Sequence, residues 1–200
     1  MTKRIATQWT DAIIRCDEKL ASKRAVILYG MELLISTFIG IGLIAVISLI
    51  AHEPLALVFF LLAFAPLRHT AGGYHANTHF QCYMVFSGIF TLVIVLEKTL
   101  LITNTICWVM TIISTFIVFA LAPCVPNNKP INEEGRQRNR KFSCILICID
   151  FLSATTILLT QIDRTNLHYY YWGVLSAAVS LVAAKIKKYQ GECTNENKNS

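Results

Sequence analysis

Long stretches without a charged residue constrain this chain more than any other feature. Residues 33–51 and 100–125 contain no Asp, Glu, Lys or Arg. A helix of about 20 apolar residues crosses the roughly 30 Å hydrocarbon core of a bilayer. The composition agrees, because 54% of the residues are apolar and only 15% are charged. A soluble domain of this size would have to expose too much of that apolar surface, so the sequence predicts an all-α integral membrane protein.

Six apolar runs follow one another and predict about six transmembrane helices. They cover residues 25–51, 55–67, 83–96, 100–125, 142–162 and 167–184. The second and third runs are short, since 13 helical residues span only about 20 Å. We therefore expect the polar segment between them to continue these helices or to dip into a pocket between the others, where irregular backbone is tolerated.

The distribution of basic residues predicts the orientation. With six spans and both termini inside, only Lys98 and Arg164 of the 18 Lys and Arg residues fall outside. This bias is typical of cytoplasmic loops, so residues 68–82 should face the cytoplasm. The same distribution indicates that the net charge of +6 reflects contact with a membrane surface and not binding to nucleic acid. The expected organisation is an interfacial helix over residues 1–24, a membrane domain over 25–188 and a polar cytoplasmic tail over 189–200.

The N-terminal 24 residues carry one apolar stripe among many basic residues. The stripe consists of residues spaced three or four apart, namely Ile5, Trp9, Ile13, Cys16 and Leu20. Such spacing predicts an amphipathic helix lying on the cytoplasmic membrane face. An ordinary helix packed on a partner remains the alternative, and no cleavable signal peptide is expected.

The polar segment 68–82 concentrates the groups that can do chemistry. It holds three of the five histidines together with Arg68, Gly72, Gly73 and Cys82. A cysteine nucleophile needs a nearby base or a positive potential. His79 lies three residues before Cys82 and would face it on a helix. His75 lies seven residues before it, so its use requires a bend, for which the glycine pair gives freedom.

Two other readings of the segment stay open on spacing alone. His69, His75, His79 and Cys82 have a spacing that could form a zinc site, although no Glu stands between His75 and His79 as in a zinc-protease helix. The residues could also merely cap helices and meet lipid headgroups.

The chain resembles the accessory gene regulator protein B family, which are membrane-embedded cysteine endopeptidases of Gram-positive quorum sensing. The resemblance rests on Arg68, Gly72-Gly73, His75-Ala76 and Cys82-Tyr83, and on the later Ala122-Pro123 and Lys129-Pro130-Ile131. It implies that Cys82 is the nucleophile, that His75 is the base and that Arg68 is needed. It also implies no metal or cofactor and a place in the bacterial cell membrane.

The resemblance further implies a substrate, the precursor of an autoinducing peptide. Such a propeptide is cleaved at its C-terminal side and held as a thioester on the cysteine, and it then closes into a thiolactone or lactone. The membrane lipids are the other expected partner, and a homodimer is left open. A small peptide exporter without covalent catalysis is the alternative function.

Three further residues, together with Arg68, are candidates for supporting roles. Gln81, Arg68 or backbone N–H groups could stabilise an oxyanion. We expect a basic polar loop over residues 126–141, in which Lys129 and the other basic residues could steer an acidic propeptide. Asp150 is the one charge within its apolar run. It could pair with Arg68, orient His75 or form a structural bond between helices.

Overall fold

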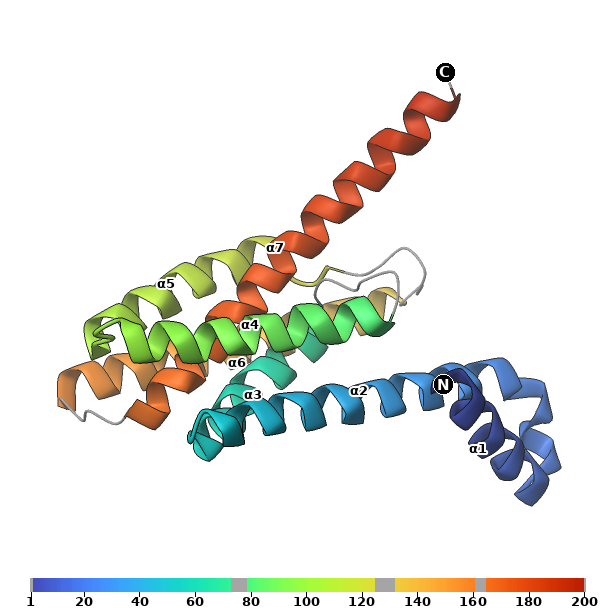
Figure 1. The fold of residues 1–200 in the computed structure, drawn as a ribbon. Coiled ribbons are helices and arrows are strands. Elements are labelled where there is room, and N and C mark those ends of the chain that lie inside the picture. The colour runs from blue at the N-terminus through green and yellow to red at the C-terminus, as the bar shows by residue number, and fades with distance from the viewer. Residues whose placement is uncertain (1, 73–78, 125–131, 161–164, 200) are drawn as a thin grey trace.

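The computed structural model describes residues 2–72, 79–124, 132–160 and 165–199, and nearly all of them are helical. The chain runs through the elements shown in Figure 1. They are α1 (Thr2–Cys16), the 3₁₀ helix η1 (Glu18–Lys23), α2 (Arg24–Ile50), α3 (Pro54–Ala71), α4 (His79–Thr99), α5 (Asn104–Leu121), α6 (Glu133–Thr160) and α7 (Thr165–Asn199). The all-α prediction is confirmed for the part of the chain described.

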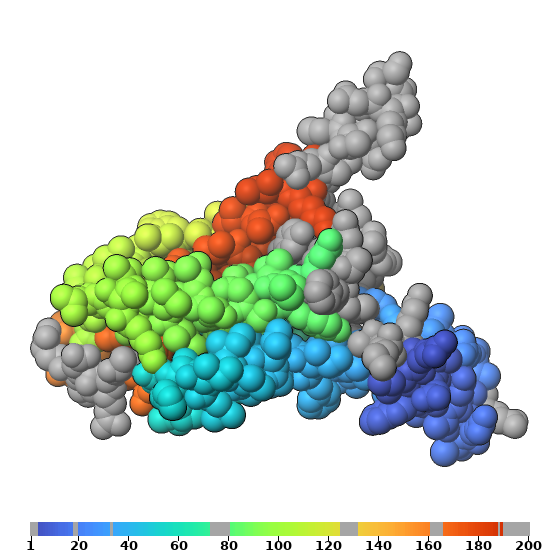
Figure 2. Space-filling model, in the orientation of Figure 1, coloured from blue at the N-terminus to red at the C-terminus, as the bar shows by residue number. Residues whose placement is uncertain are grey.

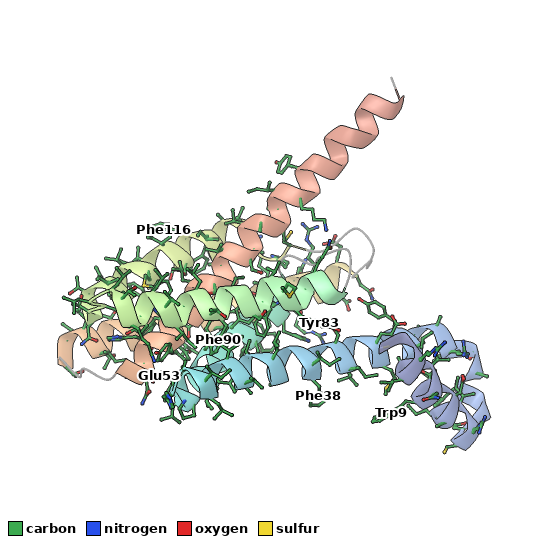
Figure 3. The ribbon with its side chains drawn as sticks, in the orientation of Figure 1. Trp9, Phe38, Glu53, Tyr83, Phe90 and Phe116 are labelled. Atoms are coloured by element: carbon green, nitrogen blue, oxygen red, sulfur yellow. The ribbon has the colours of Figure 1, made fainter. Side chains whose placement is uncertain are left out.

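Five of these helices are long and apolar enough to cross a membrane, namely those within Leu20–Ile50, Pro54–Ala71, Gln81–Thr99, Asn104–Leu121 and Glu133–Thr160. Their outer surfaces carry large apolar side chains. Phe38 and Phe116 are 71% and 73% exposed and point away from the bundle (Figure 3). Exposing such an apolar surface to water is unfavourable, whereas contact with lipid chains is not. These are the properties of a multi-pass membrane protein.

The short second and third apolar runs are parts of longer helices, because the polar residues that flank them in the sequence are also helical. The second run continues as α3 to Ala71, and the third begins earlier, as α4 at His79. The prediction that the polar segment extends both helices is therefore confirmed.

α7 is the helix against which α3 and α5 pack, and it passes through the bundle in Figure 1. The backbones of α7 and α3 lie close together at Gly173, where an added Cβ would lie 2.6 Å from the carbonyl oxygen of Phe60. The predicted sixth span, residues 167–184, lies within this helix, which continues to Asn199. In the part of the chain that the structure describes, α7 is less apolar than those five helices. His168, three tyrosines and Trp172 lower the hydropathy of its first turns.

A buried polar cluster joins α4 to α7. Glu97 Oε1 lies 2.8 Å from His168 Nδ1, and Glu97 Oε2 accepts a hydrogen bond of 2.9 Å from Trp172 Nε1. The side chains of Glu97 and His168 are only 4% and 5% exposed. Buried ionisable groups are tolerated when they are bonded in this way, so the cluster fixes the end of α4 on α7.

The N-terminal segment forms a unit at one end of the molecule, which Figure 2 shows in blue. α1 ends at Cys16, so the prediction of one helix through residue 24 is wrong at its C-terminal end. The chain turns at Asp17 into η1, and Arg24 of α2 forms an ion pair of 2.8 Å with Asp11. This pair and the packing of α1 on α2 favour the turn over a longer straight helix.

α1 has a buried and an exposed side. Ala6 and Thr10 are fully buried, whereas the apolar Ile5, Trp9 and Ile13 are 42%, 59% and 37% exposed. Trp9 projects away from the helices around it (Figure 3).

The basic segment before the fifth span is helical from Glu133 onward, so the prediction of a loop up to residue 141 is wrong there. Glu133 and Glu134 occupy the first turn, where negative charge complements the helix dipole. The Arg, Gln and Lys residues that follow are good helix formers.

Candidate active site

Arg68 lies in the last turn of α3 and is held there by two neighbours. Its Nη1 donates a hydrogen bond of 2.9 Å to Ser180 Oγ on α7. Its guanidinium carbon lies 5.4 Å from the centre of the Phe64 ring, an attractive cation–π geometry. The positive charge is thereby fixed between α3 and α7.

Cys82 lies in the first turn of α4 and is half-buried. It lines the same pocket as Arg68, and the two side chains are near enough to interact electrostatically. The helix N-terminus also favours negative charge. The pocket has a volume of about 100 Å³, and its other walls are formed by Val85, Phe86, Ile89, Val179, Ser180 and Ala183. The site thus places a thiol and an anchored positive charge at one small pocket.

Gly72 ends α3 in a conformation that side chains rarely adopt, with φ +84° and ψ −172°. The residue forms a parallel β-bridge with Cys124, whose N–H donates to the carbonyl of Ala71 at 2.9 Å. A Cβ on Gly72 would collide with the carbonyl oxygen of Cys124. Cys124, directly after Ala122-Pro123, is therefore docked on the end of α3, beside a residue 52 positions earlier in the sequence.

Several predicted site residues lie outside the described part of the chain. They are Gly73, His75 and Lys129. His79 is the first residue of α4, but its side chain is not described. The choice of His75 over His79 therefore stays a prediction. Gln81 is exposed on the first turn of α4.

Asp150 is buried on α6 and accepts a hydrogen bond from the Tyr170 hydroxyl of α7. One turn away, Ser153 Oγ lies 3.2 Å from the Tyr171 hydroxyl. Asp150 thus forms a hydrogen bond between α6 and α7, and its predicted roles toward Arg68 and His75 stay predictions.

Sequence reasoning missed Ser180 and the wall that α7 contributes. Ser176 and Ser180 are both nearly buried and stand four residues apart in an otherwise apolar stretch. Polar residues in a membrane helix face the bundle interior, so this spacing is the signal that could have identified that side of α7.

Comparison with known proteins assigns the family. The family model described as Accessory gene regulator B matches residues 6–183. A Clostridium perfringens (strain SM101 / Type A) protein named "Putative AgrB-like protein" is 28% identical over 137 residues, 65% of this chain. The match spans 64% of that relative, slightly less than two thirds of its length. No solved structure matches. Because the family model covers most of the chain, including the candidate site, the chain belongs to the accessory gene regulator B family.

Proposed function

We propose that this chain is a membrane-embedded cysteine endopeptidase of bacterial quorum sensing. It would cleave the propeptide of an autoinducing peptide at its C-terminal side and promote cyclisation to a thiolactone or lactone. Family membership supports this proposal. The observation that carries it is that Cys82, at the start of α4, shares a pocket with the anchored Arg68.

The proposed first step is acyl transfer to Cys82. His75 takes the thiol proton, and the sulfur attacks the carbonyl carbon of the scissile peptide bond. An S–C bond forms, the C–N bond breaks, and His75 returns the proton to the leaving amine. The N-terminal fragment is then a thioester on Cys82. The positive charge of Arg68 would stabilise the thiolate and the oxyanion that forms during attack.

Ring closure in this proposal is a second acyl transfer. An internal Cys or Ser of the bound fragment attacks the thioester carbonyl, the new thioester or ester closes the ring, and Cys82 leaves as a thiolate that regains its proton. Water would hydrolyse the intermediate instead, so it must be kept out. The largely apolar walls of the pocket suit this requirement.

The membrane arrangement proposed here has six spans, α2 to α7, with both termini and the site on the cytoplasmic side. α1 would lie on that surface with its exposed apolar stripe in the lipid headgroup region. The basic residues that follow the first turn of α6 would attract an acidic segment of the propeptide; they are Arg136, Arg138, Arg140 and Lys141.

The test is cleavage of the propeptide encoded beside this gene by the purified protein in liposomes. Cys82→Ala should abolish cleavage. Cys148→Ala, which changes an exposed cysteine of α6, should retain it. Cleavage by the Cys82→Ala protein would overturn the proposal, and transport of uncleaved propeptide across the liposome membrane would favour the exporter.

A further inference from the structure

Ser180 of α7 is a nearly buried hydroxyl that bonds to a charged side chain of another helix. Its Oγ accepts the hydrogen bond of 2.9 Å from Arg68 Nη1. Other buried hydroxyls, such as those of Thr111 and Ser114, donate to the carbonyl four residues earlier in their own helix. Such bonds stay within one helix, whereas the bond to Ser180 joins α3 to α7.

The packing of α7 on α3 determines where Ser180 lies. Gly173 lies against the backbone of Phe60 on α3, two to three ångströms closer than a side chain would allow. Ser180 follows Gly173 by seven residues, and Arg68 follows Phe60 by eight, which is about two helical turns in each case. The two helices therefore run in the same direction, and the face of α7 that meets α3 at Gly173 also presents Ser180 to Arg68.

Without a partner on α7, the Arg68 guanidinium has another place to go. Arg68 lies in the last turn of α3 and is partly exposed. Long basic side chains near the end of a membrane helix extend toward headgroups and water, and they regain conformational entropy when released. The walls of the pocket do not confine the guanidinium, because Val85 and Val179 are themselves 45% and 53% exposed.

The two printed contacts of Arg68 do different work. The Phe64 ring attracts the guanidinium over its face, but a cation–π contact tolerates many orientations of the cation. A hydrogen bond is directional, so the bond from Nη1 to Ser180 sets where the planar guanidinium points. Both side chains of this bond line the pocket that contains Cys82.

We propose that Ser180 is a positioning residue for the acyl transfer, because its hydroxyl keeps the positive charge of Arg68 in the pocket beside Cys82. The contribution of Arg68 to catalysis rests on the proposed function. The position of its charge relative to the Cys82 sulfur does not.

The first measurement therefore needs no propeptide. Iodoacetate and iodoacetamide are similar in size, and each forms an S–C bond with Cys82 as iodide leaves, but only iodoacetate carries a negative charge at neutral pH. The ratio of their rates reports the positive potential at the sulfur, because the ionised fraction of the thiol is the same for both. The rates are measured by peptide mass spectrometry on the full chain in phosphatidylcholine nanodiscs.

Both Arg68→Gln and Ser180→Ala should lower the iodoacetate to iodoacetamide ratio by about threefold or more, the effect of one nearby unit charge on an anion. The double variant should give the same ratio as Arg68→Gln, since Ser180 acts only through Arg68. Ser176→Ala is the matched control. Ser176 is nearly buried one turn earlier on α7 but lies outside the pocket, so this variant should keep the wild-type ratio.

The second measurement is propeptide cleavage by the same proteins. Ser180→Ala should lower kcat by about tenfold with KM nearly unchanged, because the positioned charge acts on the transition state and hydrogen bonds to charged groups are among the stronger ones. Ser176→Ala should keep the wild-type kcat. A role limited to packing would instead lower the unfolding temperature of Ser180→Ala and leave the alkylation ratio unchanged.

A wild-type alkylation ratio or a wild-type kcat in Ser180→Ala would overturn the inference. So would a double variant whose ratio falls below that of Arg68→Gln, because Ser180 would then act independently of Arg68. A lowered ratio in Ser180→Ala, with no propeptide cleavage by the wild-type protein, would refute the proposed function alone. Wild-type cleavage that Ser180→Ala leaves intact would refute this inference alone.

Discussion

Replacing Gly72 with alanine tests whether the contact between the end of α3 and Cys124 matters for activity. The native backbone, with φ +84° and ψ −172°, lies in a region that is nearly restricted to glycine. A residue with a Cβ is less stable there by about 1–3 kcal/mol. The added Cβ would also meet the carbonyl oxygen of Cys124, so the hydrogen bond between Cys124 N–H and the Ala71 carbonyl would have to shift.

This strain converts to an expected loss of activity. Since about 1.4 kcal/mol corresponds to a factor of ten, the correctly docked population should fall by about 5- to 150-fold. Because the added Cβ also collides with Cys124, we expect a fall near the upper end of this range. His75 and Cys82 follow Gly72 by three and ten residues in the sequence, so we expect the rate of propeptide cleavage to fall with that population.

The assay compares Gly72→Ala with Gly88→Ala in liposomes, together with thermal unfolding of both proteins. Gly88 lies within α4, and a Cβ there meets no atom within 4 Å. Alanine in a helix interior is more stable than glycine by about 0.5–1 kcal/mol, so the Gly88→Ala control should keep its activity. If Gly72→Ala cleaved the propeptide at the wild-type rate and unfolded at the wild-type temperature, this reasoning would be refuted.

The remaining predictions concern the base, metal independence and topology. His75→Ala should reduce cleavage by about 10²–10⁴-fold, the usual contribution of a general base, while His79→Ala should cost much less; the opposite order would assign the base to His79. Strong chelators should leave cleavage unchanged and thiol alkylation should stop it, whereas loss on chelation with recovery on adding zinc would favour a metal site. Cysteine introduced at Arg136 should react with an impermeant reagent only from the cytoplasmic side, and cysteine at His52 only from outside; external labelling at position 136 would contradict the six-span arrangement.

The helices were predictable because their signal is local. An uncharged run such as residues 100–125 is read directly from the chain, and α5 lies within it. The helix ends were less predictable, as α1 and α6 show, since ion pairs and charges at the first turn decided them. The need for backbone freedom at the Gly72-Gly73 pair was also foreseen, and Gly72 has a positive φ.

The pocket could not be predicted, because its contacts join distant parts of the chain. Arg68 and Ser180 of the pocket are 112 residues apart, and Glu97 and His168 of the buried polar cluster are 71 residues apart. No local pattern pairs them; they meet because α7 passes between the other helices. The docking of Cys124 on Ala71 is similarly non-local. The resemblance identified both segments but gave no reason for them to touch.

The most direct test of the central claim is to trap the acyl group on Cys82. The reconstituted protein is mixed with propeptide, quenched rapidly in acid and measured by intact-protein and peptide mass spectrometry. The account predicts an adduct on Cys82 equal to the N-terminal propeptide fragment less one water, removable by hydroxylamine and absent from the Cys82→Ala protein. Cleavage that proceeds with no such adduct at any quench time, or an adduct on another residue, would contradict the account.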